Sequence, residues 1–181
     1  MKRILAALAL AAMTAFPAEL PRKSPEYVIE MLDGKDQLLS KYRGKVCVVE
    51  FFNPACSHCQ NTARILVKLE QELGAKGFQP IAIAADLQHK PGIPQFISQF
   101  GISFPVGFTS NEKAMAYLQH SVMAPFMVPQ LVFIDKQGMI RAQHVGGDAL
   151  FQDEENNIRK KVIELLAAPP LAVSKKLPVK K

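Results

Sequence analysis

The chain has 181 residues, 49% hydrophobic and 21% charged, a balance that excludes an intrinsically disordered chain and predicts one globular domain. The formal net charge of +6 arises at the two ends, where six basic residues lie, because the remaining 16 basic residues match the 16 acidic ones. A neutral middle offers no basic stripe, so the composition argues against a nucleic-acid partner.

Residues 1–18 predict a secretory signal peptide. Lys2-Arg3 precede an apolar stretch from Ile4 to Met13, and small residues and Ala18 follow. The apolar stretch is too short for a stable transmembrane anchor. We therefore predict cleavage after Ala18 and export to the periplasm. The large Phe16 near the cleavage site leaves one alternative open, an uncleaved anchor that holds the protein at the membrane and facing the periplasm.

The hydrophobic pattern predicts strands that alternate with helices. Residues 46–52 are almost continuously apolar, which is typical of a central strand covered on both faces. Residues 60–73 place Ile65, Leu66 and Leu69 at helical spacing. The predicted order is a hairpin of residues 26–31 and 37–39, a strand at 46–52, a helix at 60–73, a strand at 80–85, helices at 94–100 and 112–118, a hairpin of 131–134 and 139–145, and a helix at 153–167. This order predicts an α/β fold, a mixed central sheet flanked by helices.

The last predicted helix has an apolar face that consists of Ile158, Val162, Ile163 and Leu166. Beyond it, residues 169–181 are basic and contain prolines, which predicts a disordered tail. The folded domain is therefore expected to comprise residues 19–168.

The motif Cys56-Ser57-His58-Cys59 carries the most chemical information. It places two thiols three positions apart, where a predicted strand turns into a predicted helix. Backbone N–H groups and the helix dipole stabilise a thiolate at such a position, so the motif predicts disulfide exchange. A permanent structural disulfide and a metal site remain as alternatives, although no second cysteine pair or paired histidine follows. Cys47, the third cysteine, lies in an apolar run and is expected to be a buried core thiol.

The dithiol, the order of elements, a proline before a late strand and the phrase Phe133-Ile134-Asp135-Lys136-Gln137-Gly138 together resemble the thioredoxin superfamily. Within it, the chain is similar to exported TlpA/ResA-like thiol-disulfide oxidoreductases, which are related to the AhpC/TSA redoxins. The resemblance covers the chain from Pro25 to Leu166. It implies a thioredoxin-like fold with an N-terminal β-hairpin and a βαβ insertion, and an enzyme without a cofactor or metal. It also implies protein thiols and disulfides as partners and a membrane or soluble upstream redox donor, and we expect a monomer.

The resemblance assigns different roles to the two cysteines. Cys56 attacks the partner and Cys59 resolves the mixed disulfide, which leaves a Cys56–Cys59 disulfide in the oxidised protein. Ser57 and His58 are expected to tune the ionisation of Cys56, unless His58 is only an exposed loop residue. A histidine at this position is familiar from DsbA-like oxidants, whereas most TlpA-like proteins are reductants. We favour a reductant, and the direction stays open.

Two further parts of the site follow from the resemblance. Glu50 is a carboxylate in an apolar run, and it precedes Cys56 by six positions, as the buried acid of thioredoxin-like proteins does. This offset implies a general acid/base for Cys59, and the alternative is an edge-strand glutamate that faces water. Val128-Pro129 is expected to be a cis-proline step that faces the dithiol and presents the backbone of Val128 to a substrate, with Pro125 as the competing proline.

Two other functions remain open on the same fold. A peroxiredoxin-like thiol peroxidase needs a threonine or serine and a proline where this chain has Asn53 and Val49, which argues against it. A copper or haem-assembly metallochaperone without turnover would use the thiols as ligands. In Sco-like proteins of that kind the cysteines are four positions apart, whereas here they are three apart.

Overall fold

The protein is described by a computed structural model that covers residues 19–169. The predicted signal peptide lies outside the described residues, as does the predicted tail beyond Pro169. Within residues 19–169, no helix has both the length and the apolar character needed to cross a membrane.

In the described part of the chain, eight strands form one sheet in the order β1-β8-β7-β4-β5-β6-β2-β3. The central strand β4 pairs in parallel with β5 and antiparallel with β7, so the sheet is mixed, as predicted. The pair β2 and β3 is the predicted N-terminal hairpin, and it joins the sheet through β6. The strands are β1 (Arg22–Lys23), β2 (Val28–Met31), β3 (Gln37–Leu38), β4 (Val46–Phe52), β5 (Phe78–Ala85), β6 (Val106–Thr109), β7 (Gln130–Ile134) and β8 (Met139–Val145).

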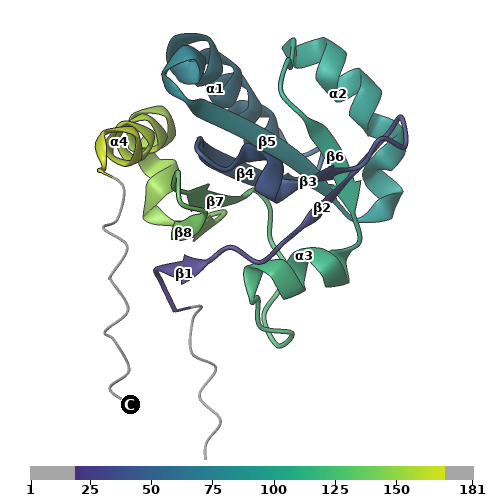
Figure 1. Ribbon diagram of the computed structural model, residues 1–181. Coiled ribbons are helices and arrows are strands. Elements are labelled where there is room, and N and C mark those ends of the chain that lie inside the picture. The colour runs from purple at the N-terminus through teal and green to yellow at the C-terminus, as the bar shows by residue number, and fades with distance from the viewer. Residues whose placement is uncertain (1–18, 170–181) are drawn as a thin grey trace, which may run out of the picture.

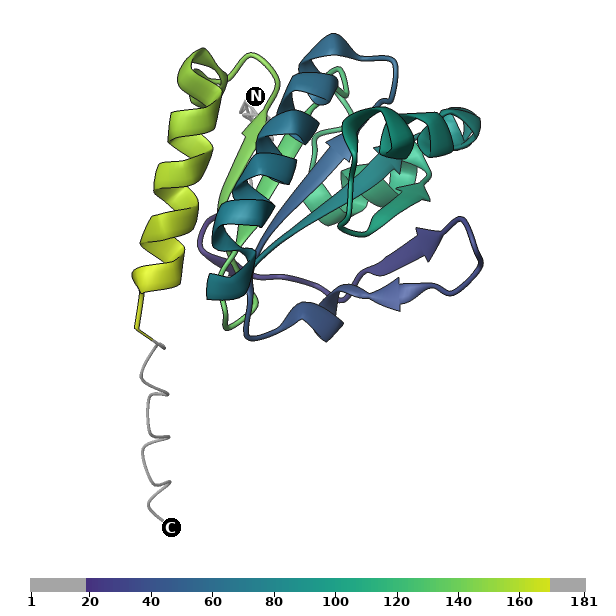
Figure 2. The same ribbon diagram turned by 90° about the horizontal axis from the view of Figure 1, so that it is seen from above.

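Helices cover both faces of the sheet. One face is covered by α1, α2 and α4, and the opposite face by α3, as Figures 1 and 2 show from two directions. The helices are α1 (Ser57–Leu73), α2 (Ile93–Phe100), α3 (Asn111–Leu118) and α4 (Glu154–Ala167), with shorter 3-10 turns η1 (Leu39–Tyr42), η2 (Gly74–Lys76), η3 (Leu87–Gly92) and η4 (Ala149–Asp153). Two packed cores result, one on each side of the sheet.

Strand β4 is the element that places an acid under the site. All seven of its residues are buried, because the sheet continues on both sides of it and helices cover both of its faces. Side chains alternate between faces along a strand, so Glu50 shares the face of Val48 and Phe52, which pack under α1. The alternative of an edge-strand glutamate that faces water is therefore wrong.

Two sequence-based details differ from the structure. Helix α1 begins at Ser57 and not at residue 60, because the carbonyl of Cys56 already accepts the first helical hydrogen bond from Gln60 N at 3.0 Å. On α4, Ile163 is 47% exposed, and the buried face consists of Ile158, Val162 and Leu165. These three recur at the four- and three-residue spacing of a helix, and a residue directly after Val162 is turned about 100° away from them.

Gly107 in β6 lies where β2 packs tightly against the sheet. A Cβ atom there would lie 2.6 Å from Ile29 Cγ2 and 2.7 Å from the carbonyl oxygen of Glu30. Because a paired strand backbone yields little, we expect Gly107→Ala to lower the free energy of unfolding by about 1–3 kcal/mol in a urea titration. Gly74→Ala is the control, since its Cβ would meet only Glu70 Cγ at 3.7 Å. Equal stability of the two variants would contradict this packing.

Candidate active site

The dithiol lies at the N-terminus of α1. Cys56 is the N-cap residue, with extended backbone (φ −80°, ψ 121°), and it is half-buried. Cys59 is completely buried in the first turn, and both residues are free thiols in this structure. Ser57 and His58, between them, are exposed. Only Cys56 is therefore open to attack on a partner, and Cys59 is placed behind it, the arrangement expected of an attacking and a resolving thiol.

The Val128–Pro129 step faces the first thiol. Its peptide bond is cis, as predicted, and the Cys56 thiol lies 3.9 Å from the carbonyl oxygen of Val128. The loop after β8 supports the step, because Gly146 N donates a hydrogen bond to the Pro129 carbonyl at 2.8 Å. A Cβ atom at Gly146 would lie 3.2 Å from the Val128 carbonyl oxygen. The predicted juxtaposition is thus present, and the role of Val128 in binding substrate stays a prediction.

A cavity of about 380 Å³ opens beside this step. Its apolar walls include Met127, which is 51% exposed, and the half-buried Phe151. These side chains supply apolar surface near the dithiol. The lining residues are His58, Met127, Val128, Pro129, Gly146, Gly147, Asp148, Phe151 and Gln152.

Glu50 lies in the core on the same side of the sheet as the dithiol. Its side chain is completely buried, and neither carboxyl oxygen has a hydrogen-bond partner within the described residues. Burial raises the pKa of Glu50 well above its usual range, and the nearby groups Glu154 and Cys56 act in the same direction. Burial also raises the pKa of Cys59, with Glu50 as the second cause. Glu50 therefore disfavours the Cys59 thiolate, and its role as the general acid/base for Cys59 stays a prediction.

Cys47 is separated from the site by the sheet. It lies on the opposite face of β4, in the core under α3, and is 3% exposed, as predicted. Burial raises the pKa of its thiol to about 12. Cys47 is therefore a core residue that does not reach the Cys56/Cys59 pair. Among residues 19–169, no three His, Cys, Asp or Glu side chains gather closely enough to hold a metal ion.

Comparison with known proteins places this arrangement in a family. The model of the Redoxin family matches residues 20–161. The chain belongs to the Redoxin family. Its relatives include the thiol-disulfide oxidoreductase ResA of Bacillus thuringiensis (strain Al Hakam), 26% identical over 128 residues that cover 71% of this chain and 70% of the relative. ResA of Geobacillus kaustophilus is 24% identical over 135 residues, which cover 75% and 74% of the two chains.

Solved structures confirm the thioredoxin-like fold of this chain. A thiol:disulfide interchange protein of the thioredoxin family from Chlorobium tepidum superposes with a TM-score of 0.67 and 23% identity, covering 81% of this chain and 97% of the other. The thioredoxin domain of a thiol-disulfide oxidoreductase from Bacteroides vulgatus superposes with a TM-score of 0.62 and 21% identity, covering 78% of this chain and 96% of the other. Together, these matches confirm the predicted TlpA/ResA-like class within the thioredoxin superfamily, and with it the enzyme class of a thiol-disulfide oxidoreductase.

Sequence reasoning missed three of the residues that shape this site. Met127 and Phe151 were not predicted to line a cavity, and Glu154 was not predicted to approach Glu50. The only local signals were the position of Met127 directly before Val128-Pro129 and the glycine pair Gly146-Gly147 after a strand. Phe151 and Glu154 come from η4 and α4, and packing alone brings them to α1.

Proposed function

We propose that the chain is an exported thiol-disulfide oxidoreductase that reduces disulfides of protein partners through Cys56 and Cys59. One observation carries the proposal: an accessible Cys56 lies at the start of α1 against the Val128 carbonyl, with Cys59 buried behind it. That placement gives the two thiols unequal access to a partner, which ordered exchange requires.

The cycle has two steps. The Cys56 thiolate attacks one sulfur of a partner disulfide, and the other partner sulfur leaves as a thiolate. Cys59 then transfers its proton to the Glu50 carboxylate and attacks the Cys56 sulfur of the mixed disulfide, which releases the second partner thiolate. The partner has gained two electrons, and Cys56 and Cys59 are joined in a disulfide that an upstream thiol donor must reduce again.

The reducing direction rests on the resemblance to TlpA/ResA-like proteins, most of which are reductants. A stabilised thiolate would favour the reduced dithiol and make the disulfide more oxidising. The Cys59 thiol provides no such stabilisation, because burial and Glu50 both raise its pKa. His58 is exposed, so solvent weakens its influence on Cys56. Export, a soluble or membrane-bound donor, and a monomeric state are parts of this proposal that rest on the sequence and on the resemblance to exported relatives.

The full chain should catalyse reduction of insulin disulfides by a small thiol donor, and the resulting precipitation of insulin measures the rate. Acceleration that disappears in Cys56→Ala supports the proposal. Thiol-dependent consumption of hydrogen peroxide without insulin reduction would instead indicate a peroxidase. Stoichiometric copper retained after dialysis against a chelator, again without insulin reduction, would indicate a metallochaperone.

A further inference from the structure

Glu154 joins the first turn of α4 to the buried face of α1. One of its carboxyl oxygens accepts a hydrogen bond from the Thr62 hydroxyl, and the other accepts one from Asn61 Nδ2 at 2.8 Å. Thr62 is completely buried and follows Cys59 by three residues, so it lies on the same face of α1. The Glu154 carboxylate is thereby fixed next to the helical turn that carries the resolving thiol.

The contacts of Glu154 hold its carboxyl group in one place. Each of its two oxygens accepts a hydrogen bond from α1. The carboxyl group also lies in the first turn of α4, at the positive end of the helix dipole. The two hydrogen bonds restrict the side chain, so the charge keeps one position instead of moving into solvent.

This charge lies close enough to act on Glu50, because α4 packs against β4, the strand that carries Glu50. The titratable groups that act on Glu50 are Glu154 from α4 and Cys56 from α1. Glu50 acts in turn on Cys59 of α1. The strands on either side place Ala82 and Leu131 next to Glu50, which carry no charge. Burial is the largest cause of the raised pKa of Glu50, and Glu154 is the next. Among residues 19–169, none of the ion pairs includes Glu50.

We infer that Glu154 is a positioning residue that acts through Glu50: its fixed charge makes the Glu50 carboxylate a stronger base toward the Cys59 thiol. The inference rests on the proposed function, in which the Cys59 proton passes to Glu50 as the sulfur of Cys59 attacks the mixed disulfide. A base that is paired with a hard-to-ionise thiol benefits from neighbours that raise its proton affinity. Burial supplies most of that effect, and Glu154 adds to it from across the helix interface.

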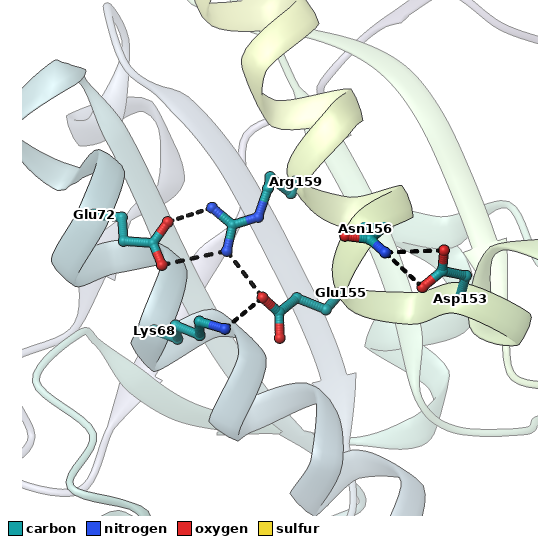
Figure 3. A network of polar contacts seen from close by, with 6 residues as sticks. All are labelled: Lys68, Glu72, Asp153, Glu155, Asn156 and Arg159. Carbon is teal, nitrogen blue, oxygen red and sulfur yellow. Dashed lines mark hydrogen bonds and ion pairs between the residues drawn. The ribbon is translucent and has the colours of Figure 1, made fainter.

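The neighbouring Glu155 provides a matched control. It carries the same charge one position further along α4, but it contacts Lys68 Nζ at 2.7 Å and Arg159 at 2.9 Å. Figure 3 shows this network, in which Arg159 also pairs with Glu72 of α1. Glu155→Gln therefore removes an equal charge and an α1–α4 contact without touching Thr62 or Asn61.

The test compares the pH dependence of mixed-disulfide resolution by stopped-flow in the full chain, Glu154→Gln and Glu155→Gln. In Glu154→Gln we expect the acidic limb to move to lower pH by about half a unit to one unit, because a like charge is removed. The rate on the plateau should fall roughly two- to three-fold, because the base is weaker. Glu155→Gln should keep the wild-type profile. Overlapping profiles for Glu154→Gln and wild type would overturn the inference.

A second variant and a direct titration separate the inference from folding and from the proposed function. Thr62→Val keeps Glu154 but removes the hydrogen bond to one of its carboxyl oxygens. The acidic limb of the pH profile should therefore move to lower pH, by less than in Glu154→Gln. An unchanged profile would contradict the idea that Thr62 fixes the position of the Glu154 carboxyl group. Carbon-13 NMR of the Glu50 carboxyl group, recorded without any partner, should show that Glu50 titrates at a lower pH in Glu154→Gln than in wild type. A missing shift there overturns the inference, whereas wild type that resolves no mixed disulfide overturns the proposed function alone.

Discussion

Replacing Cys59 with serine is expected to abolish turnover and to leave the protein covalently attached to its partner. Cys56 remains accessible at the start of α1, so it still attacks a partner disulfide. A serine hydroxyl at the buried position has no thiolate with which to release the partner. A band of higher mass on a non-reducing gel, which disappears with reductant, measures this complex, and mass spectrometry of its peptides should locate the bond at Cys56.

The other two cysteines supply the controls. Cys56→Ser should form no mixed disulfide at all, because the remaining thiol of the pair is 0% exposed. Cys47→Ala should retain full turnover, since Cys47 lies on the opposite face of the sheet. A complex that forms equally in Cys56→Ser, or that maps to Cys47, would show that the order of attack is wrong.

Replacing Glu50 with glutamine is expected to slow the resolution of the mixed disulfide by roughly 10²- to 10⁴-fold, the usual contribution of a general acid or base. Glutamine keeps the shape of the side chain but cannot accept the proton of Cys59. Formation of the mixed disulfide by Cys56 should be nearly unaffected, so the loss should appear only in the second step. Unchanged resolution rates between pH 6 and pH 9 would remove Glu50 from the mechanism.

The same variant should change how stability depends on pH. The folded-state pKa of Glu50 is raised above its value in the unfolded chain, so the unfolded state releases this proton first as pH rises. Wild type therefore loses stability from about pH 4.3 upward, by about 1.4 kcal/mol per pH unit, until the folded pKa is reached. Glu50→Gln lacks this loss. In urea titrations, the free energy of unfolding of the variant should rise relative to that of wild type between pH 5 and pH 8. A difference between the two free energies that is constant over this range would contradict the raised pKa.

Local sequence signals were enough to predict the centre of the fold and three parts of the site. The continuous apolar run of β4 predicted a central strand, and the charged residue inside this run was expected to be buried with it. The spacing of Cys56 and Cys59 at a strand-to-helix turn, and a proline directly before β7, are also readable within a few residues. Each of these features depends on residues close together in the chain.

The missed features depend on contacts between distant segments. Glu154 reaches Thr62 across 92 positions, and no local pattern indicates which face of α4 meets α1. Phe151 approaches Val128 only because η4 brings the chain back across the end of β7 and β8. The wrong assignment of Ile163 has a related cause, because two adjacent apolar residues fit a helical stripe equally well until the packing partner is known.

If the Cys56/Cys59 pair works as a reductant of protein disulfides, its reduction potential must be low. Equilibrating the full chain with glutathione or thioredoxin of known potential measures this value. We predict a value near that of thioredoxin, about −270 mV. A value near about −120 mV, typical of a strong disulfide donor such as DsbA, would contradict it.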